Sequence, residues 1–247
     1  MKKLTLAAAV ALISPAVTLA QIPVSDVDLT RFYVRLGASF VYPDDDNTSL
    51  KFDVLQHWEL YRTGWKIDDD TTWNVSGVWR PLNYLGVELL YIGEATHGAD
   101  LTRFNAYPGR DNIHFGRFAT TSANLFVNWY MTDETCLGQP YLGIGVNYTD
   151  FYDDELNPEM QRFLMDSGLA TGLAKFGMGH SWGASAQLGL DWRLGHGRAW
   201  LINAAVMYTD TDTDGAVTFP ISPGYDRLYA DFEYSPWTLN LGVTYEF

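Results

Sequence analysis

The last eleven residues of the chain constrain its fold more than any other feature. Six apolar side chains, from Trp237 to Phe247, alternate without a break with five residues that are polar or small. Because successive side chains of a β-strand point to opposite faces, this period of two predicts a strand with one apolar and one polar face. A soluble β-sandwich and a membrane barrel both contain such strands, so other parts of the chain must decide between them.

The amino-terminal segment predicts export. Two lysines precede an apolar run from Leu4 to Ile13, and a signal-peptidase site follows at Ala20. This pattern is typical of a secretory signal peptide, residues 1–20, whose apolar core is too short to cross a bilayer. We therefore expect a mature domain over residues 21–247, in which no later run is long and apolar enough for a membrane-spanning helix.

Composition narrows the class of protein and of partner. The formal net charge is −14, with 16 Lys and Arg against 30 Asp and Glu. Binding to phosphates needs basic patches, so nucleic acid is not an expected partner. Cys136 is the only cysteine, which excludes an intrachain disulfide, and no Pro- or Ser-rich linker divides the chain. A single domain is the simplest interpretation.

The alternating pattern of the carboxyl terminus recurs seven more times. The eight expected strands cover residues 32–42, 74–79, 85–91, 122–129, 142–149, 182–193, 200–208 and 237–247. The connections alternate between short turns, at 80–83, 132–139 and 195–197, and long segments, at 43–71, 95–117, 150–179 and 209–236. Short turns on one side and long loops on the other are typical of outer-membrane barrels. The sequence therefore predicts an all-β fold, an eight-stranded antiparallel transmembrane β-barrel with periplasmic turns and extracellular loops, located in the bacterial outer membrane.

Membrane chemistry assigns the two faces of each strand. In lipid every backbone polar group must be paired within the protein, so the sheet has to close and its apolar face has to point outward. Aromatic residues near the strand ends fit the rings that mark the membrane interfaces. The polar faces then line the interior, where charges of both signs can pair with one another. The main polar residues expected in the lumen are Arg35, Glu88, Asn147, Gln187, Asp191 and Arg193.

Several segments in the right order resemble one known family. They are residues 32–46 (FYVRLGASFVYPDDD), 85–90 (LGVELL), 140–151 (PYLGIGVNYTDF), 181–189 (SWGASAQLG) and the closing LGVTYEF. Together they look like the outer membrane protein W (OmpW/AlkL) family. The resemblance implies an eight-stranded barrel whose narrow, largely apolar interior passes or binds small hydrophobic molecules. Residues 117–122 (RFATTS) depart from the usual His-Leu-Pro-Pro stretch of the family, so ligand specificity is not carried over.

The glycines of the predicted inner face leave two interpretations open. An eight-stranded barrel is just wide enough to be filled by side chains or to hold one slender ligand. Gly143, Gly145 and Gly183 are on the face expected to point inward, where they leave room for a narrow conduit. They equally fit positions at which glycine relieves tight strand curvature.

The long loops are more apolar than solvated loops need to be. Loop residues that are candidates for a ligand pathway are Trp58, Trp65, Phe163, Met165 and Met178. They fit an extracellular vestibule that collects a lipophilic solute, since flexible methionine suits a promiscuous site. They fit equally well a packed cap over the barrel, with a short helix over residues 158–166.

Chemical motifs for catalysis, metals or cofactors are weak. The acidic groups at 44–46, 68–70 and 153–155 lack the spacing of a calcium loop with its turn glycine, so no metal site is expected. His180 and Ser181 are adjacent in a strand and point to opposite faces, which argues against a catalytic pair and an enzyme. The GxG at 143–145 lacks a following helix and third glycine, so no cofactor is expected.

Two classes of function remain. The first is a narrow channel or binding conduit for passive uptake of small hydrophobic molecules. The second is a structural or receptor-like outer-membrane protein with a plugged barrel and no transport role. The expected partners are outer-membrane lipids, lipopolysaccharide, small hydrophobic solutes and, during biogenesis, the barrel assembly machinery. Tyr245 and the terminal Phe247 resemble the signal that this machinery recognises.

Overall fold

The computed structural model describes residues 30–44, 49–52, 59–60, 63–104, 111–133, 135–170, 172–195, 199–218 and 227–247. The predicted signal peptide and Trp58 lie outside these residues.

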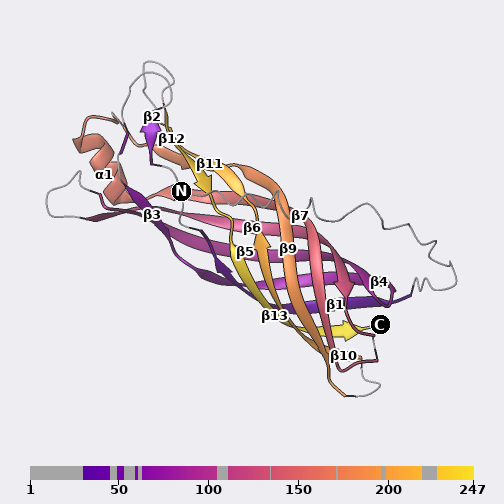
Figure 1. The fold of residues 1–247 in the computed structure, drawn as a ribbon. Helices are drawn as coiled ribbons and strands as arrows, with labels where there is room; N and C mark the ends of the chain where they lie inside the picture. The colour runs from indigo at the N-terminus through magenta and orange to yellow at the C-terminus, as the bar shows by residue number, and fades with distance from the viewer. Residues whose placement is uncertain are drawn as a thin grey trace, which may run out of the picture.

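Eight long antiparallel strands close into a barrel (Figure 1). They are β1 (Phe32–Tyr42), β4 (Asp70–Leu82), β5 (Leu85–Thr102), β6 (Asn112–Tyr130), β7 (Gly138–Leu156), β9 (His180–Arg193), β10 (Trp200–Thr209) and β13 (Trp237–Glu246). The order around the wall is β5-β4-β1-β13-β10-β9-β7-β6, and pairing of β5 with β6 closes it. The carboxyl-terminal strand therefore pairs with both β1 and β10. The eight-stranded barrel expected from the sequence is confirmed.

The long connections gather at one end of the barrel, the long-loop end, opposite the carboxyl terminus (Figure 1). They form a second, four-stranded sheet of β2 (Lys51–Phe52), β12 (Arg227–Glu233), β11 (Asp212–Thr218) and β8 (Lys175–Gly177). A short strand, β3 (Gly64–Ile67), extends the barrel sheet beside β5. The helix α1 (Pro158–Asp166) has the bounds expected from the sequence. The Asn157 side chain accepts a hydrogen bond from the Glu159 amide and caps the helix.

The outward faces of the eight strands form an apolar band with an aromatic ring at each edge, which we call the membrane band. Exposed aliphatic side chains such as Leu36, Leu89, Ile144 and Leu188 fill its middle. The ring near the long loops contains Tyr42, Trp73, Tyr91, Tyr148, Trp182, Tyr208 and Trp237. The ring near the turns contains Phe32, Trp79, Trp129, Trp192, Trp200, Tyr245 and Phe247. The band is the one expected of a barrel in lipid. No helix of the described residues is long and apolar enough to cross a membrane.

Strand β5 continues well beyond the end that the sequence predicts. Its buried positions are even-numbered from Gly86 to Ile92 and odd-numbered from Ala95 to Leu101. A register shift against β6 between Ile92 and Ala95 is the β-bulge that changes the phase. The expected loop 95–117 is therefore wrong over most of its length, because β5 and β6 form a long hairpin there. The bulge breaks the strict alternation on which the expected boundary at Tyr91 depends.

Other predicted boundaries also require correction. Residues 150–156, expected in a loop, continue β7. The strands of the second sheet lie in the expected loops, with β2 in 43–71, β8 in 150–179, and β11 and β12 in 209–236. The expected strand 74–79 extends at both ends, so the turn after β4 is only Asn83 and Tyr84. Arg80 and Pro81, expected in that turn, lie in the strand. Proline at the end of a strand resembles a turn signal in the sequence, although it is tolerated where its missing N–H is not needed.

Candidate functional site

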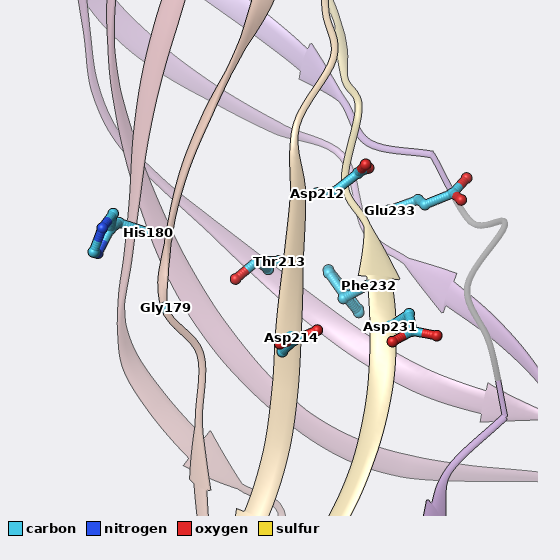
Figure 2. Close-up of a pocket in the computed structure, with 8 residues that line it drawn as sticks. All are labelled: Gly179, His180, Asp212, Thr213, Asp214, Asp231, Phe232 and Glu233. Carbon is cyan, nitrogen blue, oxygen red and sulfur yellow. The ribbon is translucent and has the colours of Figure 1, made fainter. Parts of the chain in front are cut away.

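An acidic groove lies on the surface near the start of β9 (Figure 2). It has a volume of about 490 Å³ and is lined by Gly179, His180, Asp212, Thr213, Asp214, Asp231, Phe232 and Glu233. Burial and the neighbouring Asp210 raise the pKa of Asp212. Among the described residues, no three His, Cys, Asp or Glu side chains are placed to hold a metal ion. His180 is exposed and Ser181 is buried, so the two adjacent side chains face apart, as the sequence predicts.

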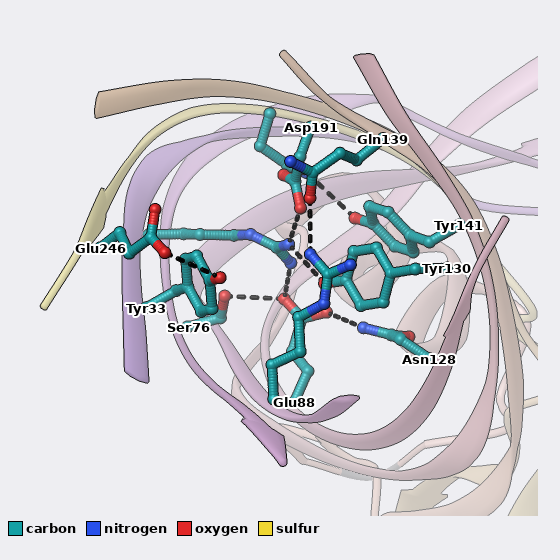
Figure 3. A network of polar contacts seen from close by, with 12 residues as sticks. Tyr33, Ser76, Glu88, Asn128, Tyr130, Gln139, Tyr141, Asp191 and Glu246 are labelled. Atoms are coloured by element: carbon teal, nitrogen blue, oxygen red, sulfur yellow. Dashed lines mark hydrogen bonds and ion pairs between the residues drawn. The ribbon is translucent and has the colours of Figure 1, made fainter. Parts of the chain in front are cut away.

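The interior of the barrel at its short-turn end is filled by a network of charged and polar side chains (Figure 3). We call this group, centred on Arg35, the polar network. The Arg35 guanidinium donates to the carboxylates of Glu88 and Asp191 at 2.6 Å each. All three side chains are nearly inaccessible to solvent. Two buried carboxylates therefore share one buried cation.

Neutral donors complete the pairing of both acids. Ser76 and Asn128 each donate to Glu88 at 2.7 Å, and Gln187 does so at 3.0 Å. Asn203 donates to Asp191 at 2.8 Å. Buried charges are stable only when paired and surrounded by hydrogen-bonding groups, and both acids meet that condition.

A second buried arginine, Arg80, lies in β4 where the sequence predicts a turn, so the sequence pattern does not indicate its place in the lumen. The Arg80 guanidinium lies 3.8 Å from the centroid of the Tyr130 ring and donates to Gln139 at 2.5 Å. It also donates to the main-chain oxygen of Asn83. Tyr130 in turn accepts from Arg35 at 3.3 Å, so the polar network extends to the turn end of the barrel. These buried side chains thus occupy the turn end of the lumen.

The other polar residues expected in the lumen lie outside the polar network. Arg193 pairs with Glu246 at 2.5 Å near the rim, where Tyr33 also donates to Glu246. Asn147 lies nearer the long loops and accepts from Thr149 at 2.8 Å. The structure thus brings together Arg35, Glu88, Gln187 and Asp191, and it places Asn147 and Arg193 on either side of them.

The three candidate glycines adjoin atoms of the protein. A Cβ added at Gly143 would lie 2.2 Å from the Asn128 side-chain oxygen and 2.8 Å from Gln187. At Gly145 and Gly183 it would lie 2.2 Å and 1.6 Å from main-chain oxygens of neighbouring segments. The room that these glycines provide is therefore taken by the polar network and by close backbone approach. Their place in a ligand pathway stays a prediction.

A small cavity lies inside the barrel, on the long-loop side of the polar network. Its walls combine apolar groups such as Ile92, Met207 and Pro236 with hydroxyls such as Thr120 and Thr209. Its volume is about 20 Å³, which is room for about one water molecule. No charged side chain lines it. A larger occupant would require the side chains that line the cavity to move.

Above this cavity the interior is a dense apolar cluster, which we call the cap. Its buried residues are Val41, Leu50, Leu60, Trp65, Ile67, Ala95, Ala99, Leu101, Phe104, Ile113, Phe115, Phe118, Phe151, Met160, Phe163, Leu164, Ala170, Ala174, Phe176, Val217, Leu228, Ala230, Phe232 and Tyr234. The Trp65 ring makes edge contacts with Phe115 and Phe232 at centroid distances of 4.9 and 5.7 Å. Close aromatic packing of this kind leaves no open vestibule among these residues.

The loop residues proposed for a ligand pathway occupy different places in the cap. Trp65 and Phe163 are buried in it, and Met178 packs against it while half-buried. Met165 is 42% exposed on the outer side of α1. Of the two alternatives that the sequence allows, an open vestibule and a packed cap, this arrangement is the packed cap. A role of these residues in binding a solute stays a prediction.

Comparison with known proteins identifies the family of this barrel. The OmpW family model matches residues 29–247. The chain belongs to the OmpW family. Outer membrane protein W of Salmonella typhi is 29% identical over 87% of this chain and 88% of the relative. The solved structure of OprG from Pseudomonas aeruginosa superposes with a TM-score of 0.69 and 26% identity, covering 90% of this chain and 97% of OprG. The AlkL structure shares the fold, with a TM-score of 0.58 and 19% identity over 90% of this chain and 92% of AlkL.

Membership in the OmpW family confirms the bacterial outer membrane as the location. The proteins that the comparisons identify are outer-membrane barrels, and the relatives are named as outer membrane proteins. The long-loop end accordingly faces the exterior, and the short-turn end faces the periplasm.

Proposed function

We propose that this OmpW-family barrel mediates passive uptake of small, uncharged hydrophobic molecules. The observation that carries the proposal is the apolar cap, which lies on the exterior side of the barrel and adjoins an uncharged inner cavity. Transfer of an apolar solute from water into such surroundings is favourable by about 25 cal/mol per Å² of buried apolar surface. The family resemblance supports the same class of solute.

The polar network constrains the route of such a solute. An apolar molecule gains nothing by crossing the paired charges of Arg35, Glu88 and Asp191, and separating them would leave buried charge uncompensated. The hydrocarbon around the membrane band offers a favourable destination from the level of the cavity. The proposed route therefore opens through the cap and leaves the barrel above the polar network.

The same network favours a second candidate, a structural or receptor-like protein without transport. Its buried ion pairs fill the lumen, and the described loops are packed. Both candidates predict no steady ion current through a single barrel in a planar bilayer. They differ in the transfer of hydrophobic solute.

Solute uptake by cells that express the chain separates the two candidates. Expression should accelerate accumulation of a small radiolabelled alkane relative to cells with the same vector and no insert. Phe163→Ser should alter the rate because Phe163 is buried in the cap, whereas Leu173→Ser should not because Leu173 is 71% exposed. Equal accumulation with and without a correctly folded barrel in the outer membrane would reject uptake and leave the structural role.

The remaining functional assignments are part of the same proposal. We assign the chain no catalytic role, since the adjacent His180 and Ser181 side chains face apart. Outer-membrane lipids and lipopolysaccharide are its expected surroundings.

Tyr245 and Phe247 form an edge contact at 4.9 Å beside the lipid, and Phe247 is 72% exposed. Both are accessible to the assembly machinery, and deletion of Phe247 should slow barrel insertion in a reconstituted assembly assay.

A further inference from the structure

His97 is a fully buried histidine in the part of β5 that extends beyond the membrane band. Its Nδ1 atom lies 2.8 Å from the main-chain oxygen of Asp68, and its Nε2 atom lies 2.9 Å from the Tyr234 hydroxyl. A main-chain oxygen only accepts, so Nδ1 carries the proton and Nε2 accepts from Tyr234. The neutral imidazole is therefore satisfied at both nitrogens.

The partners of His97 come from separate segments of the long-loop end. Asp68 lies between β3 and β4, and Tyr234 lies between β12 and β13. Thr120 of β6 is 3.1 Å from the Tyr234 hydroxyl. One imidazole thus connects the β5–β6 hairpin to the segment before β4 and to the base of the β11–β12 hairpin.

The β11–β12 hairpin is connected along the chain to β10 and β13 by two short links, residues 210–211 and 234–236, which can act as a hinge. Tyr234 and Ser235 donate from their main chain to Thr211, and Ser235 has a φ of 20°, which is rare outside glycine. Pro236 follows and fixes the entry into β13. Tyr234 and Thr120 also line the inner cavity. Release of Tyr234 would therefore loosen the hairpin directly above that cavity.

Burial opposes a charge on His97 more strongly than its neighbours favour one. Desolvation lowers the pKa of His97, although the Asp68 main-chain oxygen and the charges of Asp70, Asp69 and Asp68 act to raise it. The Phe118 and Tyr234 rings lie 5.4 and 5.5 Å away and offer no counter-charge. Of the elements packed against His97, the β3–β4 link contributes Asp68 and Asp69, and the start of β4 contributes Asp70. The β12–β13 link contributes Tyr234, and β6 contributes the uncharged Phe118 and Thr120.

We propose that His97 is an acid-sensitive latch whose protonation releases the β11–β12 hairpin and opens the cap. The closed state holds His97 neutral, whereas hydrated imidazole has a pKa of about 6.5. Opening therefore takes up a proton, and acid favours the open state. Above pH about 6.5 the ratio of open to closed molecules does not change with pH. Below pH about 6.5 this ratio rises by up to about tenfold per pH unit, until the pH reaches the pKa that His97 has in the closed state.

Pulsed electron spin distance measurements on the full chain in lipid nanodiscs test the latch. In a Cys136→Ser background, spin labels at Asn112→Cys and Thr218→Cys would report the distance between β6 and β11, which are exposed at both positions. We expect one short distance at pH 7.5 and a growing population of longer distances below pH about 6.5. His97→Gln keeps a donor and an acceptor without a titrating ring, so it should remain closed at pH 5.

His114 supplies the matched control, because it lies in the β5–β6 hairpin together with His97. It is exposed and pairs with Asp100 at 2.6 Å, and this hydrogen bond and the charge of Asp100 raise its pKa. His114→Gln should retain the acid response. Distances that stay constant to pH 4.5, or an acid response that persists in His97→Gln, would overturn the latch. Should His97→Gln not fold, histidine ¹⁵N NMR of the unsubstituted chain decides, because protonation of His97 without a change in distance contradicts the proposal.

Discussion

The two halves of the barrel bury opposite chemistry on the same strands. Within the membrane band, Glu88 of β5 points inward and Leu89 points outward. From nine residues beyond Glu88 along β5 the polarity is reversed, since His97, Ala99 and Leu101 are buried while the alternate residues lie outward. Thus the membrane half has a polar interior and an apolar surface, and the long-loop half has an apolar interior and a polar surface.

The solvent outside the wall explains this reversal. Water surrounds the long-loop half, so the hydrophobic effect drives apolar side chains inward to form the cap. Lipid surrounds the membrane half and is as apolar as the side chains that face it, so burial of apolar surface gives no comparable driving force there. Ion pairs and hydrogen bonds, which are strong in a low dielectric, hold that interior together. The two halves should therefore respond to different substitutions.

The largest effect is expected at the centre of the polar network. Arg35→Met leaves the carboxylates of Glu88 and Asp191 buried without their cation, which should lower the free energy of unfolding by about 3–5 kcal/mol. Urea titration of the refolded barrel in micelles, followed by gel mobility, measures the loss. Arg117→Met is the control. Arg117 forms an ion pair with Glu155, but the two side chains are 61% and 66% exposed, so this pair contributes only about 0–1 kcal/mol. Equal losses in both variants would contradict a stabilising network.

A change of similar size, confined to the long-loop half, is expected for the cap. Trp65→Ala removes the ring that packs on Phe115 and Phe232, which should destabilise the cap by about 3–5 kcal/mol. Hydrogen exchange should increase in β3, β11 and β12 and stay unchanged in β13. Leu173→Ala, on the exposed side, should leave both regions unchanged. Faster exchange in β13 as well would show that the two halves unfold together.

A single added methyl group should destabilise the membrane half but not the long-loop half, with a smaller loss than the two substitutions above. Gly143→Ala places a methyl group against Asn128 and Gln187 of the polar network, with an expected loss of about 1–3 kcal/mol. Gly177→Ala in β8 meets no neighbouring atom and has no such cost. The urea midpoints of the two variants provide the comparison. A stable Gly143→Ala would mean that the network has room for a passage.

The smallest effect is expected at the amino terminus of α1. Asn157→Ala removes the side-chain acceptor for the Glu159 amide and should cost about 1 kcal/mol of local stability. Exchange of the first amides of α1 measures this loss, and Asn157→Asp should restore most of it. An effect on the urea midpoint of the whole barrel would indicate coupling between cap and membrane half.

Regular alternation made most of the fold predictable. The strands ending at Tyr42 and beginning at Trp237 match their sequence patterns, because lipid on one side requires every second residue to be apolar. The helix at 158–166 is equally visible, from the proline at its start and its apolar spacing. The prediction failed at β5, where the bulge after Ile92 changes the phase, and at Arg80, which a turn-like Pro81 places in the wrong element.

Sequence by itself determined the barrel, its strand number, the membrane band and the polar character of the lumen, since these depend on local periodicity and on the solvent that each face meets. Only the tertiary structure decided which polar residues meet. Arg35, Glu88 and Asp191 come from three separate strands, and their pairing depends on how the sheet closes. The placement of His97 between Asp68 and Tyr234 depends likewise on contacts between loops, which no local pattern encodes.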